Sequence, residues 1–499
     1  MTLLDLAQGI ADKENYDSAI DHLRGKKILL PTLAELAKPG DIDHSVMDIC
    51  NNIHADEPHS ANLFRVHWYN NDERNGLADV PGHLIINSDF TGVDAPIVVV
   101  LGDRFPMIQA HKVLAAYACL VTRLISGQFD PAQHRAIWPS TGNYCRGGIA
   151  ISRILGCRGV AVLPTGMSRE RFDWLERWVT DPSDIVRTPG SESNVKEIYD
   201  KCAELSAQPS NVILNQFSEF ANYLVHYKCT GTALDHVFMH LKTENNELNL
   251  AAFVAGTGSG GTLGAGDYLK DHHGTKIVAV EPLECPTMLY NGYGEHNIQG
   301  IGDKHIPLVQ NVMNTDIVAA VSDQRCDSLN VLFNTTVGHQ YLINRRGLDS
   351  GIVENLTKLG LSGIANLLAA IKTARLLKLT KNDVVITVAT DSGALYASER
   401  ISTENEFFPE GFDQTSAGET YARDLLGVDG DHILETTQRD RDRIFNLGYY
   451  TWVEQQGISL EDFEIRRDQK FWNNLHQLLP VWDEMIKEFN HRTGADQFE

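Results

Sequence analysis

Strand-like and helix-like segments alternate through the middle of this chain, and no other feature limits its possible folds as strongly. Short apolar runs rich in Val, Ile and Ala predict strands, and amphipathic stretches between them predict helices. Such alternation over about 300 residues predicts an α/β fold, with parallel sheets covered by helices on both faces. Clear strand candidates are RAIWPS (135–140), GVAVLP (159–164), SNVILN (210–215), LAAFVAG (250–256), KIVAVE (276–281) and DVVITVA (383–389).

The two ends of the chain differ from this middle part. Residues 1–60 are polar and helix-like. The runs that follow predict further strands, namely FRVHWY (64–69), HLIIN (83–87) and PIVVVLG (96–102). Residues 401–499 are acidic and predict a helical extension, in which Pro480 should break the amphipathic stretch 471–489.

The composition argues against several classes of partner. The formal net charge is −23, whereas nucleic acids and anionic membranes attract basic proteins. No apolar run reaches the ~18 residues of a membrane span, and the N-terminus has no signal-peptide pattern. The eight cysteines form no C-x-x-C pair, and the 19 histidines form no metal-ligand spacing. We therefore expect a cytoplasmic protein with reduced cysteines and without a metal, nucleic-acid or membrane partner.

The glycine-rich stretch VAGTGSGGTLGAG (254–266) follows a predicted strand and has two interpretations. Glu281 lies 20 residues beyond its third spaced glycine, where a dinucleotide-binding fold keeps its ribose-binding acid. This favours an NAD-dependent oxidoreductase. Hydroxyl groups in the same loop instead suit the three oxygens of a single phosphate. The G-x-G-x-x-G glycines are Gly256, Gly258 and Gly261, and the hydroxyl-bearing residues are Thr257, Ser259 and Thr262.

Three other segments place polar groups at the ends of predicted elements. The turn in WPSTGNYC (138–145) precedes a helix and suits an anion such as a carboxylate. The stretch NQFSEFANYLVHYKCTG (215–231) is amphipathic with a polar start, and TVATDSGALY (387–396) ends a strand in a turn. Each of these is also typical of an ordinary turn or helix start, so none decides the function alone.

Taken in chain order, these segments resemble the consecutive motifs of the fold type II pyridoxal-phosphate enzymes. The resemblance covers roughly residues 60–400 and is closest to the cysteine synthase and cystathionine β-synthase family. Stretch 215–231 distinguishes this sulfur-amino-acid branch from the serine/threonine dehydratases. The other matching segments are IQAHKVLAAYA, PSTGNYCRGGIAISRILGCRGVAVLP, GMSRERFDWLERW, VAGTGSGGTLGAGDYLK, IVAVEP, IQGIGDKHIP, GLSGIANLLAAIKTA and TDSGALY.

This resemblance implies two parallel-sheet α/β domains with the active site between them, and a homodimer. The large, cofactor-binding domain would comprise residues 61–105 and 221–400, and the small domain residues 106–220. Residues 1–60 and 401–499 would be N-terminal and C-terminal extensions.

The resemblance also assigns roles to individual residues. Lys112 matches the lysine that forms the Schiff base with pyridoxal phosphate, and Asn143 the residue that binds the 3-oxygen of its ring. Ser392 matches the group facing the pyridine nitrogen. The phosphate cup would consist of Gly256, Thr257, Gly258, Ser259, Gly260, Gly261 and Thr262. The substrate carboxylate would bind Ser140, Thr141, Gly142, Asn143 and Gln216.

A hydroxyl group at the pyridine nitrogen makes the ring a weaker electron sink than a carboxylate would. The resemblance therefore implies β-elimination or β-replacement on a serine-like or cysteine-like amino acid through an aminoacrylate, with Lys112 as the base. A deaminase or racemase of the same fold, and a cofactor-free binding protein, remain alternatives.

Three departures from the family pattern lie around the expected substrate pocket. Lys112 follows FPMIQAH, where the family has a Pro/Ser-rich turn. Arg146 belongs to the insertion YCRGG, and is either a solvent-exposed loop residue or an arm that binds a second anionic group of the substrate. After IQGIG the chain has Asp303, Lys304 and His305, where the family has small residues and Phe.

Overall fold

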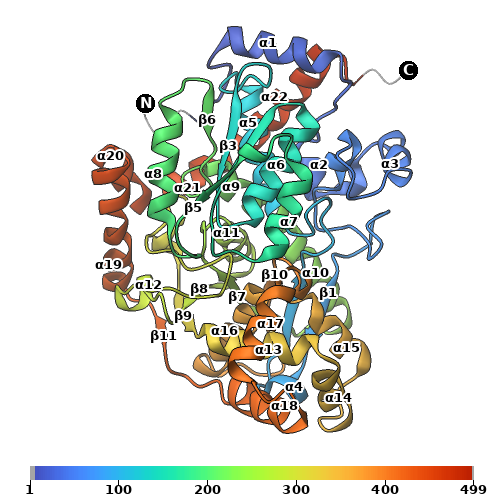
Figure 1. Cartoon of the computed structure of the whole chain (residues 1–499), viewed down its shortest axis with the longest axis vertical. Coiled ribbons are helices and arrows are strands. Elements are labelled where there is room, and N and C mark those ends of the chain that lie inside the picture. Colours follow the sequence, from blue (N-terminus) through green and yellow to red (C-terminus); the bar gives the residue numbers. More distant parts are fainter. Residues whose placement is uncertain (1–5, 497–499) are drawn as a thin grey trace.

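The computed structural model describes residues 6–496 and contains two β-sheets flanked by helices (Figure 1). The first five residues of the predicted N-terminal extension and the last three of the C-terminal one lie outside the described residues. In the described part of the chain, no helix is long and apolar enough to cross a membrane.

The larger sheet has seven strands in the order β1-β2-β10-β7-β8-β9-β11. Its inner strands are parallel, whereas β1 pairs antiparallel with β2, and β11 pairs antiparallel with β9. The strands are β1 (His83–Ile86), β2 (Ile97–Leu101), β7 (Asn249–Gly256), β8 (Lys276–Pro282), β9 (Ile317–Val321), β10 (Asp383–Ala389) and β11 (Ile433–Glu435).

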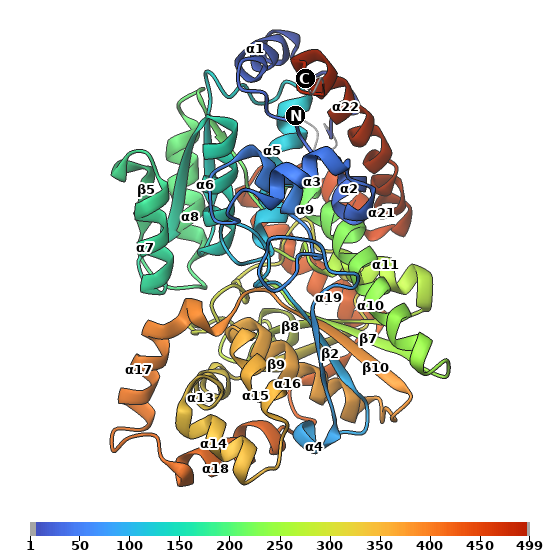
Figure 2. The same ribbon diagram turned by 90° about the vertical axis from the view of Figure 1, so that its right-hand side faces the viewer.

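The smaller sheet is parallel and has the order β5-β4-β3-β6. Its strands are β3 (Arg135–Pro139), β4 (Arg158–Pro164), β5 (Ile185–Thr188) and β6 (Asn211–Ile213). The helices nearest to it in the chain are α5 (Lys112–Ile125), α6 (Asn143–Leu155), α7 (Arg169–Trp178) and α8 (Val195–Ser206). Figure 2 shows this sheet and its helices above the larger one. Two parallel α/β units are thus present, as the alternation of the sequence predicts.

Strand β2 shows why the larger sheet needs cover on both faces. All five of its residues are buried. Val98 and Val100 belong to one hydrophobic core, while Ile97, Val99 and Leu101 belong to another. Successive side chains of a strand point to opposite faces, so an uninterrupted apolar run requires helices on both. The helices with the most extensive contacts to this sheet are α11 (Leu263–His273), α12 (Thr287–Tyr290), α15 (Ser350–Asn355) and α16 (Leu361–Leu376). The other helices of this part of the chain are α4 (Ser88–Thr91), α9 (Phe220–Val225), α10 (Gly231–Glu244), α13 (Asp323–Asn334), α14 (Thr336–Asn344) and α17 (Ala397–Phe407).

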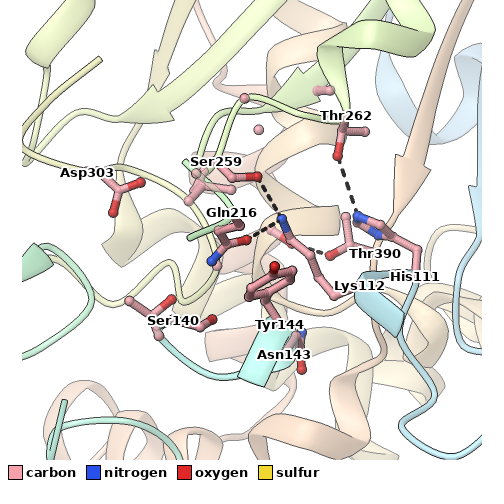
Figure 3. A pocket seen from close by; sticks show the side chains of 18 of the residues that line it. His111, Lys112, Ser140, Asn143, Tyr144, Gln216, Ser259, Thr262, Asp303 and Thr390 are labelled. Atoms are coloured by element: carbon pink, nitrogen blue, oxygen red, sulfur yellow. Dashed lines mark hydrogen bonds between the residues drawn. The ribbon is translucent and has the colours of Figure 1, made fainter. Parts of the chain in front are cut away.

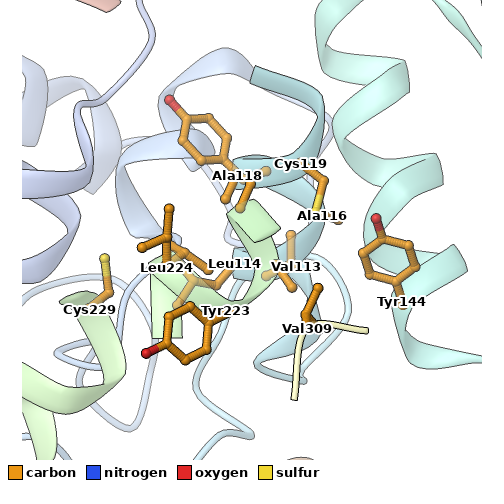
Figure 4. Close-up of a cluster of buried hydrophobic side chains, with 14 of the residues drawn as sticks. Val113, Leu114, Ala116, Ala118, Cys119, Tyr144, Tyr223, Leu224, Cys229 and Val309 are labelled. Carbon is orange, nitrogen blue, oxygen red and sulfur yellow. The ribbon is translucent and has the colours of Figure 1, made fainter. Parts of the chain in front are cut away.

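Helix α5 is the central helix of the molecule. Eleven of its 14 residues are buried, and Figure 4 shows its apolar side chains packed against Tyr223, Leu224 and Tyr144. Lys112, the first residue of α5, is half-buried where the helix begins.

The two extensions pack against each other. The N-terminal helices are α1 (Lys13–Arg24), α2 (Leu33–Ala37) and α3 (His44–Asn51), and the C-terminal ones are α18 (Gln414–Thr420), α19 (Gln438–Tyr449), α20 (Leu460–Glu464), α21 (Gln469–His476) and α22 (Leu478–Thr493). The Asp483 carboxylate of α22 accepts a 2.7 Å hydrogen bond from the Leu33 N–H, and the Asn490 amide bonds both backbone groups of Leu30. The helices α22, α1 and α2 lie together in Figure 2.

Three details differ from the sequence predictions or refine them. The run 64–69 is no strand, because Ser60–Arg65 form a 3-10 helix in which the Arg65 guanidinium donates to the Cys50 and Ile53 carbonyls. The C-terminal extension is not purely helical, since it contributes β11 to the larger sheet. The break predicted from Pro480 is confirmed at Gln477, and the proline lies in the first turn of α22, where its missing N–H costs little.

Candidate active site

One cavity collects polar groups from both sheets (Figure 3). It lies beyond the carboxyl ends of β3, β7 and β10, where parallel sheets bind their ligands. Its lining is His111, Lys112, Ser140, Thr141, Asn143, Tyr144, Glu192, Gln216, Phe217, Ala255, Gly256, Gly258, Ser259, Gly260, Thr262, Gly300, Ile301, Asp303, Ser362, Asn366, Val388 and Thr390.

The Lys112 amine is fixed at the centre of this cavity. Its Nζ donates to Gln216 Oε1 and to Ser259 Oγ, each at 2.9 Å, as the dashed lines in Figure 3 show. Burial lowers the pKa of Lys112 to about 8, against a smaller opposing effect of the Asp303 carboxyl group. At pH 7 roughly a tenth of this amine is therefore unprotonated, far more than for an ordinary lysine, which makes it available as a nucleophile and as a base.

Asn222 connects the partners of Lys112. Its side-chain amide donates to the Gln216 carbonyl at 2.9 Å and to Ser259 Oγ at 3.0 Å. Sequence reasoning gave Asn222 no role, although it lies in the stretch 215–231 that carries the family resemblance. This amide holds the glycine loop and the Gln216 segment together.

The glycine loop connects β7 to α11 and forms one wall of the cavity. Gly260 has φ +75°, which favours glycine, and a Cβ on Gly258 would lie 2.5 Å from the Gly300 carbonyl oxygen. The first N–H groups of a helix have no partner within it, so the start of α11 suits an anion. Ser259 and Thr262 add two hydroxyl groups on the cavity side.

A second polar turn connects β3 to α6. Ser140 Oγ accepts a 3.1 Å hydrogen bond from the Gly142 N–H, and Gly142 has φ +151°. Thr141 Oγ1 donates to Glu192 Oε1. This turn faces the same cavity as Lys112 with the side chains of Ser140, Thr141 and Asn143.

Comparison with known proteins identifies the family. The family model described as pyridoxal-phosphate dependent enzyme matches residues 90–330. A cysteine synthase of Staphylococcus aureus (strain Mu50) is 32% identical over 262 residues, which cover 52% of this chain and 74% of that protein. The chain belongs to the pyridoxal-phosphate-dependent enzymes. A probable cysteine synthase of Bacillus subtilis is 29% identical over 287 residues, or 57% of this chain and 83% of that one.

Solved structures support the same fold. The crystal structure of a hydrogen sulfide-producing enzyme from Fusobacterium nucleatum aligns with TM-score 0.53 and 23% identity, over 71% of this chain and 100% of that one. An O-acetylserine dependent cystathionine beta-synthase from Helicobacter pylori aligns with TM-score 0.51 and 22% identity, over 65% and 96%. The predicted fold type II is thereby confirmed, and the family model together with the 32% identical relative confirms the predicted cofactor.

The residues of the cavity fit pyridoxal phosphate. The cofactor needs an unprotonated lysine and an anion site, and the cavity offers the Lys112 amine and the glycine loop at the start of α11. When bound, the cofactor supplies a carbonyl group for the amino group of a substrate and a ring that withdraws electrons from its Cα.

The dinucleotide interpretation of the glycine loop was wrong. Both Glu281 carboxylate oxygens accept 2.8 Å hydrogen bonds from the N–H groups of Met288 and Leu289, at the start of α12. Glu281 is also not part of the cavity lining. Its position at the end of β8 therefore has a structural explanation, and it is not available for a ribose.

The predicted pairing of Ser392 with the cofactor ring is not supported by its position. Ser392 lines a separate depression together with Arg146 and Trp174. Thr390 and Ser362 instead reach the cavity, and their hydroxyl oxygens lie 2.9 Å apart. The turn after β10 carries side chains to both sides, and the sequence does not indicate which one faces inward.

Arg146 is not an exposed loop residue, and it does not line the cavity that contains Lys112. It lies on α6, is 4% exposed and donates to Asn143 Oδ1 at 2.9 Å and to the Ile108 carbonyl at 3.0 Å. Its guanidinium also lies 5.1 Å from the Trp174 ring centre. The residues YCRGG belong to the first turns of α6 and form no inserted loop. Arg146 therefore positions the Asn143 side chain through its hydrogen bond to Oδ1.

The remaining predicted residues divide into two groups. Lys112, Ser140, Thr141, Asn143, Gln216, Gly256, Gly258, Ser259, Gly260 and Thr262 line the cavity, whereas Gly142, Arg146, Thr257, Gly261 and Ser392 do not. The Gln216 side chain accepts from Lys112, while its predicted contact is the substrate carboxylate. Sequence reasoning missed Glu192, Ser362 and Thr390, and noted Asp303 without giving it a role.

Proposed function

We propose that this enzyme catalyses β-elimination or β-replacement on a serine-like or cysteine-like amino acid. The observation that carries the proposal is the Lys112 amine, held between the glycine loop and the Gln216 segment in a cavity that also contains the turn 140–143. Relatives named cysteine synthase support the same reaction class.

Each wall of the cavity has a role in this proposal. Lys112 binds the cofactor, and its freed amine then removes the Cα proton of the substrate. The Ser140 hydroxyl binds the substrate carboxylate, and the Thr141 hydroxyl does so when it turns away from Glu192. The glycine loop with Ser259 and Thr262 binds the phosphate, and Asn143 binds the ring oxygen.

We further propose that Ser362 and Thr390 take the place assigned to Ser392 from the sequence. Both bring a hydroxyl group to the cavity, and a hydroxyl does not keep a pyridine nitrogen protonated as a carboxylate would. A less electron-withdrawing ring favours loss of a β-substituent over transamination. The same family also leads us to expect a homodimer, which light scattering on the purified protein tests.

Absorbance spectroscopy tests the reaction. The purified protein should show a visible cofactor band that is lost in Lys112→Ala. Serine, O-acetylserine, O-phosphoserine and cysteine are then added one at a time, while the released β-substituent and keto acid are measured. A protein that takes up no pyridoxal phosphate contradicts the proposal, as does one that only racemises these amino acids.

A further inference from the structure

Two buried carboxyl groups of the cavity have no role in the proposed function. Glu192 is 2% exposed and Asp303 is 6% exposed, and both line the cavity that contains Lys112. Glu192 Oε2 and Asp303 Oδ2 have no hydrogen-bond partner. A buried carboxylate oxygen without a donor is costly, so two of them facing one cavity indicate a ligand that supplies N–H or O–H groups.

A cation is the ligand that suits these two carboxyl groups. Burial raises the pKa of Glu192 to about 7 and that of Asp303 well above its usual range, so a cation bound in the cavity would favour their charged forms. Buried Arg171 already acts on Glu192, whereas Lys112 is the cation that acts on Asp303.

Among the described residues, Lys112 is the only Lys or Arg of the lining, and it joins the cofactor in the proposed function. Burial lowers the pKa of His111 to about 3, so this histidine is neutral. Lys304 pairs with Glu295 at 3.0 Å, and its neighbour Asp303 is left without this cation. The cofactor phosphate and the substrate carboxylate add further negative charge.

The backbone around Asp303 is held in place from several sides. Its carbonyl accepts a 2.9 Å hydrogen bond from Thr287 Oγ1, and the Gly302 carbonyl lies 2.8 Å from His296 Nε2. From the C-terminal extension, Trp452 Nε1 donates to the Ile306 carbonyl at 2.7 Å. In Figure 3, Asp303 lies on one side of Lys112 and His111 on the other. The carboxyl group is thus fixed at the cavity wall.

We infer that the second substrate of this site is an amine, and that Asp303 accepts its proton before it attacks the β-carbon. The inference rests on the proposed function and names its nucleophile. A thiol with a pKa of ~8.5 supplies its own anion near neutral pH, whereas an alkylammonium with a pKa of ~10 must transfer a proton to a base. Glu192 adds negative charge that attracts the ammonium group.

The step conserves atoms and charge. The ammonium R–NH₃⁺ gives one proton to the Asp303 carboxylate and becomes R–NH₂. Lys112 takes the Cα proton while the β-substituent X leaves with the electron pair of the C–X bond. The nitrogen lone pair then forms the bond to the β-carbon, and Lys112 returns its proton to Cα. Asp303 then returns its proton to solvent. Overall, the amino acid and R–NH₃⁺ give the β-ammonium amino acid, X⁻ and H⁺.

A competition experiment tests this choice of nucleophile. The holoenzyme receives O-acetylserine with ethylamine and sulfide together, and mass spectrometry measures the ratio of the two products. We expect an ethylamino product from the native enzyme, and a ~100-fold lower amine-to-sulfide product ratio for Asp303→Asn, since general bases contribute 10²–10⁴-fold. Asp303→Glu should restore part of the ratio. Glu406→Gln, an exposed carboxylate that does not line the cavity, should keep the native ratio.

A binding measurement shows whether Asp303 acts as a base toward the amine or only stabilises the structure. Calorimetric titration of the holoenzyme with ethylammonium alone should show binding that is lost in Asp303→Asn, while both proteins unfold at the same urea concentration. An equal loss of sulfide and amine products in Asp303→Asn contradicts the inference. So does serine as the main product of the native enzyme, which would make water the nucleophile.

The failures of the two proposals are distinguishable. If sulfide reacts and ethylamine does not, the inference is wrong and the β-replacement function stands. If no nucleophile reacts and the protein takes up no pyridoxal phosphate, the proposed function is wrong. The inference is then also wrong, because it rests on that function.

Discussion

Replacement of Gly258 by alanine isolates the steric role of the glycine loop. Gly258 is not among the residues with positive φ, so its backbone conformation accepts a side chain. A Cβ at this position lies 2.5 Å from the Gly300 carbonyl oxygen, whereas real Cβ contacts are essentially never under 3.0 Å. One of the two backbone segments must therefore move by at least 0.5 Å, the difference between these distances.

The segment around Gly300 is poorly placed to move. The Gly302 N–H donates to the Thr257 carbonyl at 2.9 Å, and Tyr396 donates to the Gln299 carbonyl at 3.2 Å. Overpacking of a tight site costs ~1–3 kcal/mol. If this cost falls on the loop conformation that binds phosphate, pyridoxal phosphate should bind about 5- to 150-fold more weakly, at tenfold per 1.4 kcal/mol.

Cofactor titration of the apoprotein measures this loss. The matched control is Gly430→Ala, because a Cβ on Gly430 meets no atom within 4 Å and its φ is not positive. Native affinity and native urea stability in Gly258→Ala would refute the steric argument. Equal weakening in Gly258→Ala and Gly430→Ala would show that contact with the Gly300 segment is not the cause.

Three further predictions concern groups around the cavity. Burial lowers the pKa of Lys112 to about 8, so the amine is mostly neutral above this pH. The rate at which the apoprotein takes up pyridoxal phosphate should therefore increase as pH rises through about 8. A rate profile whose midpoint lies near the ordinary pKa of lysine would contradict this prediction. Arg146→Lys should weaken cofactor binding ~5-fold by releasing Asn143, at ~1 kcal/mol for the one lost hydrogen bond, without changing the preference between neutral and anionic substrates. Trp452→Phe leaves the buried Ile306 carbonyl without its hydrogen-bond donor. It should lower the free energy of unfolding, measured by urea titration, by ~1–3 kcal/mol. Tyr450→Phe is the control, because Tyr450 is 67% exposed and its replacement should leave this free energy unchanged.

The fold could be predicted because its signals are local and repeated. A buried parallel strand must be apolar on both faces, so β2, β7, β8 and β10 appear as continuous runs in the sequence. The run 64–69 is equally apolar, but the Arg65 guanidinium binds two backbone carbonyls and bends the chain away from a sheet. Tertiary hydrogen bonds of this kind produce no periodic pattern in the sequence, so sequence reasoning cannot predict them.

The site residues could be predicted where a sequence motif determines the backbone conformation. They could not be predicted where the direction of a side chain determines whether it reaches the cavity. The glycine loop and the turn 140–143 constrain φ and the start of a helix, so most of their residues line the cavity as the motifs indicate. After β10, Thr390 faces the cavity and Ser392 does not, although both belong to one matched segment. Two residues along an extended chain would share a face, but this segment turns immediately after the strand.

The C-terminal extension shows why a segment outside the matched family region still bears on the chemistry. Trp452 donates to the Ile306 carbonyl, and Arg466 Nη1 donates to the Leu308 carbonyl at 2.7 Å. His305, between Asp303 and these carbonyls, packs 5.9 Å from the Trp452 ring. The chain has a charged residue where the family has small ones, and a buried charge needs a backbone that cannot relax toward solvent. We therefore interpret the extension as the support that keeps Asp303 at the cavity wall.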